Sequence, residues 1–144
     1  MDPRSTRNAP AYGVALLRVS LGIMWIAHAL LKLLVFTLPG TAAYFASVGL
    51  PGPLAYPVFA IEIVGGAALI LGVYARQASL ALVPIMVGAA WVHFPNGWAH
   101  TSPNGGWEYP VFLIVASVAL WLLGDGALVL RRSAWLTPVQ LRSA

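Results

Sequence analysis

The sequence contains no cysteine and few charged residues, with eight basic and four acidic side chains among 144 residues. The absence of cysteine excludes disulfides, thiol chemistry, iron–sulfur clusters and cysteine-ligated zinc within this chain. The charged fraction is 8%, against about 25% in an average soluble domain. So few charges cannot cover the surface of a soluble protein, which argues against both a soluble enzyme and a disordered chain.

Several chemical motifs are missing as well. The chain has no glycine-rich phosphate loop, no nucleophile elbow and no metal-ligand spacing of the zinc or di-iron kind. His28 and His93 are candidate axial ligands of a haem, but different depths are expected for them, and Lys32 beside His28 would compete; haem is therefore disfavoured. The basic residues lie at the ends of apolar segments rather than in one patch, which argues against nucleic-acid binding.

Apolar residues dominate instead, at 60% of the chain, and the mean hydropathy is +0.82. About 20 apolar residues in a helix cross the ~30 Å hydrocarbon core of a bilayer, and helices satisfy their own backbone hydrogen bonds there. Pro84 is expected to kink the third apolar segment. We predict one all-α integral membrane domain over residues 1–144, a bundle of four transmembrane helices. The predicted helices cover about residues 13–36, 54–74, 78–94 and 109–130.

The distribution of arginine predicts the orientation of this bundle. The two connecting loops on one side, at about 37–53 and 95–108, contain no lysine or arginine. The positive-inside rule therefore places both termini and the turn at Arg76 in the cytoplasm, with these two loops facing outward. Trp and Tyr residues near the outer ends of the helices fit an interfacial belt.

The first two predicted spans contain four charged or histidine residues: Arg18, His28 and Lys32 in the first and Glu62 in the second. Charges inside a membrane are energetically costly, so such residues are functional candidates by default. Those of the first span share one helical face, which is expected to point into the bundle. This polar stripe comprises Arg18, Gly22, Trp25, His28 and Lys32.

The depths of these residues predict a contact between the first two spans. At the rise of a helix, His28 and Glu62 both lie roughly 9–12 Å below the outer ends of their helices. We therefore expect a Lys32–Glu62 ion pair, with a hydrogen bond from His28 to Glu62. The pair is interpreted either as a structural link or as a functional site. Gly65 and Gly66, one turn on, allow either close helix packing or room for a flat ligand.

A second polar group is predicted at the outer end, where the third helix ends and the fourth begins. His93 and Asn96 precede the loop, and Trp107 and Glu108 follow it. The simpler interpretations are an interfacial histidine for His93 and an N-terminal cap for Glu108. His100, in the polar loop between them, has no predicted role.

At the inner end, Arg18 is expected to pair with Asp125 near the end of the fourth helix. Arg76 lies in the cytoplasmic turn, where it serves either as a determinant of topology or as part of a site.

Taken together, these residues resemble the DoxX family of small bacterial membrane proteins. The similarity covers roughly residues 14–126. The matching pieces are Leu17-Arg18 with Gly22, His28 with Lys32, Tyr44-Phe45 with Gly49-Leu50-Pro51, Glu62 with Gly65-Gly66, Gly72 with Arg76, His93 with Asn96-Gly97, and Gly106-Trp107-Glu108-Tyr109-Pro110. Ala29 departs from the glycine that the family often has after its first-helix histidine; both residues are small.

The resemblance implies a multi-pass protein of the bacterial cytoplasmic (inner) membrane, and relatives that are membrane subunits of quinone-reducing systems. One hypothesis is therefore a quinone-linked redox subunit. In it, Lys32 and His28 donate hydrogen bonds to the quinone carbonyls, Glu62 acts on the same headgroup, His93 helps to bind it, and Trp25 or Trp91 stacks on its ring. Glu62 or Glu108 would move protons, and a soluble or membrane partner would exchange the electrons.

Two other functions fit the same residues. The protein could be a non-catalytic scaffold or assembly partner, in which the polar residues fix helix register. It could also be a transporter of a small solute or of protons, lined by the polar stripe, for which a homo-oligomer would be needed.

Overall fold

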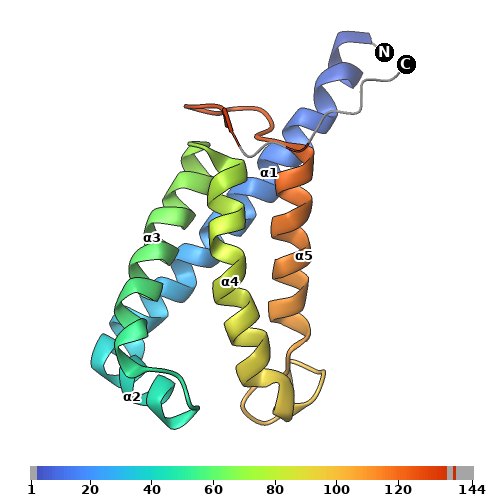
Figure 1. The fold of residues 1–144 in the computed structure, drawn as a ribbon. Coiled ribbons are helices and arrows are strands. Elements are labelled where there is room, and N and C mark those ends of the chain that lie inside the picture. The colour runs from blue at the N-terminus through green and yellow to red at the C-terminus, as the bar shows by residue number, and fades with distance from the viewer. Residues whose placement is uncertain (1–2, 136–137, 139–144) are drawn as a thin grey trace.

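The structure, a computed structural model, describes residues 3–135 and residue 138, and this part of the chain is all-helical (Figure 1). A π-helical segment, Leu31–Val35, continues the first helix, and short 3-10 turns lie at Gly52–Leu54 and Phe94–Asn96. Within the described residues the only β-type pairing is an isolated bridge between Val73 and Arg131. The helices are α1 (Pro3–Leu30), α2 (Leu38–Ser47), α3 (Ala55–Leu71), α4 (Ala75–His93) and α5 (Glu108–Leu123).

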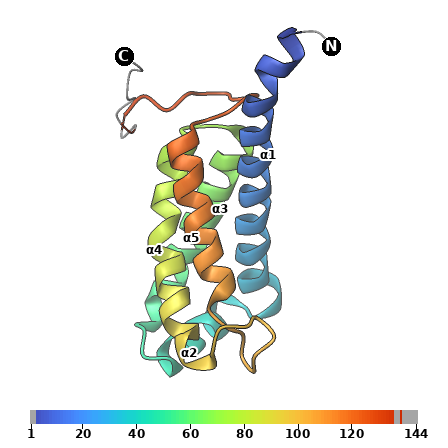
Figure 2. The same cartoon turned by 90° about the vertical axis from the view of Figure 1, so that its right-hand side faces the viewer.

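Four of these helices, α1, α3, α4 and α5, run side by side, with α1 packed mainly on α3 and α4 mainly on α5 (Figure 2). The start of α1, the α3–α4 turn and residues 124–135 lie at one end of the bundle. Helix α2 and the loop between α4 and α5 lie at the opposite end. The described parts near both termini therefore share one end, together with Arg76, Arg131 and Arg132.

Three segments are long and apolar enough to cross a membrane: Asn8–Val35, Gly52–Leu71 and Ala75–Asn96. They correspond to the first three predicted helices. Pro84 lies inside α4, and the helix continues on both sides of it. Helix α5 is also apolar but has only 16 residues, about 24 Å at helical rise. It ends at Leu123, seven residues before the predicted end of the fourth helix at 130.

The predicted outer loop 37–53 contains helix α2, which was not predicted from the sequence. Thr37 caps this helix: its hydroxyl oxygen accepts a hydrogen bond from the Gly40 N–H at 3.2 Å, and Pro39 lies in the first turn. A threonine cap followed by proline is a typical helix start. The signal was therefore in the sequence, but α2 is too short to register as a span.

Glycines set how closely the helices approach. A Cβ on Gly22 would lie 2.7 Å from the carbonyl oxygen of Gly66, and one on Gly65 would lie 2.9 Å from the side chain of Leu82. Both glycines of α3 therefore face neighbouring helices, α1 and α4. Of the two interpretations of Gly65-Gly66, the structure shows helix packing rather than space for a ligand.

Candidate functional site

The predicted ion pair between α1 and α3 is present. The Lys32 ammonium donates to both carboxylate oxygens of Glu62, each at 2.9 Å. The Glu62 side chain is 1% exposed and that of Lys32 is 18% exposed. A buried carboxylate needs such a partner, because removing a charge from water is costly. Lys32 also lies 3.5 Å from the carbonyl oxygen of His28, one turn earlier.

The π-helical segment places Lys32 at the end of α1. Its widened turn is closed by a hydrogen bond from the Phe36 N–H to the Leu31 carbonyl at 3.0 Å, five residues back. Short π-helical turns change which side chains share a helical face, and they are frequent at functional sites. Here the wider turn lies where α1 presents its lysine to α3.

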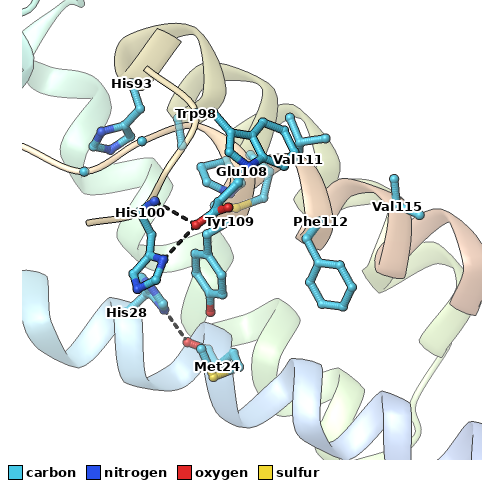
Figure 3. A pocket seen from close by; sticks show the side chains of 15 residues that line it. Met24, His28, His93, Trp98, His100, Glu108, Tyr109, Val111, Phe112 and Val115 are labelled. Atoms are coloured by element: carbon cyan, nitrogen blue, oxygen red, sulfur yellow. Dashed lines mark hydrogen bonds and ion pairs between the residues drawn. The ribbon is translucent and has the colours of Figure 1, made fainter. Parts of the chain in front are cut away.

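His28 differs from the prediction, because it does not hydrogen-bond to Glu62. Its Nδ1 lies 2.8 Å from the carbonyl oxygen of Met24. Its ring stacks on that of Tyr109, with centroids 5.9 Å apart and planes inclined by 22°. The carbonyl one turn back competes successfully for the imidazole because it lies within the same helix. His28 thus links α1 to the start of α5 (Figure 3).

A cavity of about 1040 Å³ opens beside this stacked pair. Apolar side chains of α4 and α5 form most of its wall, and the polar groups gather at the loop end (Figure 3). The polar lining residues are His28, His93, His100, Glu108 and Tyr109. The Tyr109 hydroxyl is buried and has no hydrogen-bond partner among the described residues.

The cavity does not contain all of the residues predicted to surround a ligand. His28 and His93 both line it, but Lys32, Glu62 and Trp25 do not. Trp25 is 2% exposed and belongs to the apolar core, where its indole N–H has no partner among the described residues. The structure therefore separates the predicted polar group into an ion pair between α1 and α3 and a cavity at α1, α4 and α5.

His100, which had no predicted role, makes hydrogen-bond contacts with Glu108. The Glu108 carboxylate accepts from the His100 backbone N–H and lies beside its Nδ1, both at 2.7 Å. Glu108 therefore binds the loop rather than capping α5. These hydrogen bonds from His100, first from the backbone and then from the ring, lower the pKa of Glu108, which lies at the loop end of α5. A His eight residues before a Glu, across a Gly/Pro/Ser loop, was the available signal.

The rest of this loop is held by Asn96 and Trp107. The Asn96 amide donates to the carbonyls of Asn104 at 3.2 Å and Gly105 at 2.9 Å, and its nitrogen lies 3.5 Å from His93 Nδ1. Trp107 packs edge-on against Trp98 with centroids 4.5 Å apart. Both predicted outer residues therefore shape the loop that closes the cavity.

At the end of the bundle where α1 starts, the predicted Arg18–Asp125 ion pair does not form. Arg18, 1% exposed, donates instead to four backbone carbonyls. Asp125 accepts from the backbone N–H and hydroxyl of Ser133, at 2.8 and 2.6 Å. The prediction failed because residues 124–131 leave the helix and bring free carbonyls to Arg18. The four carbonyls belong to Leu69 and Ile70 of α3 and to Ala127 and Leu128.

Arg76 is the second residue of α4, so it lies just inside the helix that follows the predicted turn. Its backbone N–H donates to the Ser133 hydroxyl at 3.2 Å. Its guanidinium lies against Gly124, where a Cβ would approach Nη2 to 2.7 Å. Arg142, which the positive-inside rule also predicts on the cytoplasmic side, lies outside the described residues.

Fold and site together define a small all-helical protein of the membrane type, with a buried ion pair next to an apolar cavity. The DoxX family profile matches residues 13–95. "Putative oxidoreductase CatD" of Bacillus subtilis (strain 168) is 32% identical over 118 residues, which is 82% of this chain and 84% of that protein. No solved structure matches the chain. The protein belongs to the DoxX family.

Proposed function

We propose that this DoxX protein is a quinone-binding membrane subunit of a redox system. The observation that carries the proposal is the cavity of about 1040 Å³, apolar along α4 and α5 and polar at its loop end. Ligand pockets for small molecules typically measure about 300–1,000 Å³ and combine apolar walls with a few polar groups. The name of the Bacillus subtilis relative, an oxidoreductase, supports the same class of chemistry.

We further propose that α1, α3, α4 and α5 all cross the bacterial cytoplasmic membrane. The end with Arg76, Arg131 and Arg132 would face the cytoplasm, following the positive-inside rule. The loop of residues 97–107 would then lie at the outer surface, with the cavity in the outer half of the bundle. Because α5 is short, both of its ends would lie near lipid headgroups: the loop end on the outer side and residues 124–130 on the cytoplasmic side.

The residues of the cavity fit a quinone. His28, His93 and the Tyr109 hydroxyl are polar groups that can hydrogen-bond with the ring oxygens of a quinone in its oxidised or reduced form. Phe112 and Val115 line the cavity and are 65% and 61% exposed, so the wall is open along α5 toward the surrounding lipid. An isoprenoid tail would leave along this side, while the polar ring stays at the loop end. When bound, a quinone supplies two-electron, two-proton redox chemistry.

Lys32 and Glu62 have a positioning role in this proposal. They do not line the cavity, but their ion pair joins the end of α1 to α3 and fixes the turn that carries His28. The chain has no cysteine and no redox cofactor motif, so we propose that electrons pass to or from a soluble or membrane-bound partner. A homo-oligomer is compatible with this arrangement.

The test is the amount of quinone that co-purifies with the protein. The full chain is purified in mild detergent and extracted, and quinone is quantified by mass spectrometry. Val115→Trp fills the open side of the cavity. Val64→Trp is the matched control, because Val64 is equally exposed, at 68%, but lies on α3 away from the cavity.

Near one quinone per chain in the natural protein and in Val64→Trp, with a loss of at least about tenfold in Val115→Trp, would support the proposal. Equal traces in all three proteins would mean that the quinone is carried over with lipid, and would overturn it. A scaffold or a transporter would then be the functions to test, by partner pull-down and by flux into liposomes.

A further inference from the structure

The hydrogen bond of His28 fixes which of its nitrogens is free. A backbone carbonyl can only accept, so the Nδ1 that lies 2.8 Å from the Met24 oxygen must carry the proton. In the neutral ring, Nε2 is then a hydrogen-bond acceptor. Nε2 has no hydrogen-bond partner among the described residues, and it is not one of the buried polar atoms, so a ligand can reach it. His28 therefore offers an acceptor to a ligand in the cavity that it lines.

The ionisable side chains near His28 are hydrogen-bonded to one another. Lys32 and Glu62, on the side of α3, neutralise one another in a 2.9 Å ion pair. His100 and Glu108, on the side of the loop, form a second pair at 2.7 Å. The stacked neighbour, Tyr109, is a phenol. Both carboxylates therefore have hydrogen-bond donors of their own, and neither accepts a hydrogen bond from His28.

We infer that the cavity binds the reduced, hydroquinone form of its ligand in preference to the quinone; this inference rests on the proposed function. A hydroquinone O–H donates to His28 Nε2, whereas a quinone carbonyl is only an acceptor and would face a second acceptor. Two acceptors placed together leave both without a hydrogen bond, which is costly in a desolvated site.

The other polar groups of the cavity do not reverse this preference. The Tyr109 hydroxyl both donates and accepts, so it fits either form. His93 Nδ1 lies 3.5 Å from the Asn96 amide nitrogen, which can only donate. Both Asn96 N–H groups already donate to the carbonyls of Asn104 and Gly105, so this contact does not fix the tautomer of His93, and a neutral His93 can present either a donor or an acceptor. A hydroquinone oxygen satisfies a donor and an acceptor together, and a quinone oxygen satisfies only the donor.

The experiment compares three ligands that share one ring and one tail. Decylubiquinone, decylubiquinol and the dimethyl ether of decylubiquinol are titrated anaerobically into the detergent-solubilised full chain, with tryptophan fluorescence quenching as the readout. The ether keeps the reduced aromatic ring but has no O–H to donate. In His28→Gln, the amide can present either its N–H or its oxygen to the ligand. His28→Phe keeps the stacked ring and removes both nitrogens, as a second variant.

We expect the natural protein to bind decylubiquinol at least about tenfold more tightly than decylubiquinone, with the ether as weak as the quinone. In both variants the ratio should fall to near one. A ratio near one in the natural protein, a preference for the quinone, or a ratio that survives in both variants would overturn the inference while leaving quinone binding intact. Absence of saturable binding by all three ligands would instead overturn the proposed function.

Discussion

Both carboxylate oxygens of Glu62 lie 2.9 Å from the ammonium nitrogen of Lys32, which joins the π-helical end of α1 to the buried face of α3. Each of these two charges is stabilised in the protein interior by the other. Removing one of them leaves the other unpaired in an apolar surrounding, whereas removing both leaves no charge behind.

Glu62→Gln should therefore destabilise the protein by about 2–3 kcal/mol; this is less than is typical of a fully buried pair, because Lys32 can extend toward water. The double variant Lys32→Met/Glu62→Leu should recover most of that loss. Thermal unfolding in detergent, followed by circular dichroism, measures both. Equal destabilisation by the single and double variants would show that the ion pair itself is not the cause.

The close crossing of α1 and α3 predicts a second effect on stability. Gly22→Ala would place a Cβ 2.7 Å from the Gly66 carbonyl oxygen, so the helices must move apart, at a cost of about 1–3 kcal/mol. Gly13→Ala and Gly88→Ala are matched controls, because a Cβ at either position meets nothing within 4 Å. Both controls should be neutral or slightly stabilising, since alanine favours a helix over glycine. Equal melting temperatures for Gly22→Ala and the controls would contradict the crossing.

The sequence predicted much of this architecture because the strongest signals are local. Long apolar runs identified the three candidate spans, and the positions of Lys32 and Glu62 along their helices were enough to predict their contact. Periodicity shows which residues share a face, but it does not show which neighbouring helix that face meets. His28 was therefore assigned to Glu62 on α3, whereas its ring stacks on Tyr109 of α5.

The remaining differences arise where the chain leaves regular helices. Leu128 and the residues around it continued an apolar run, so they were predicted as helix, but the chain turns after Gly124, where φ is +107°. That turn brings two carbonyls to Arg18. The pairing of His100 with Glu108 likewise depends on how a loop closes, which apolar periodicity does not report.

The hydrogen bonds of Glu108 predict a dependence of the loop on pH. Because its pKa is lowered in the folded protein, its ionised form stabilises the loop at and above the pKa that it has when unfolded. This contribution is lost as the pH falls through the lowered pKa of the folded state. The exchange rate of the His100 amide, corrected for the intrinsic pH dependence of exchange, should therefore rise as the solution is acidified below the usual pKa range of glutamate. Glu108→Gln should abolish that pH dependence, and an unchanged acid response in this variant would assign it to another group.

Arg18 gives the last prediction, because its guanidinium donates to carbonyls of α3 and of residues 127–128. Arg18→Lys keeps the charge but cannot reach all four acceptors, so it should cost about 2–4 kcal/mol. It should also speed amide exchange at Leu130 and Arg131, whose N–H groups bind the carbonyls of Leu71 and Gly72. Arg132→Lys, at an exposed position, is the matched control and should change stability by no more than about 0.5 kcal/mol. If Arg18→Lys melts like this control and leaves amide exchange at 130 and 131 unchanged, Arg18 does not hold this segment against α3.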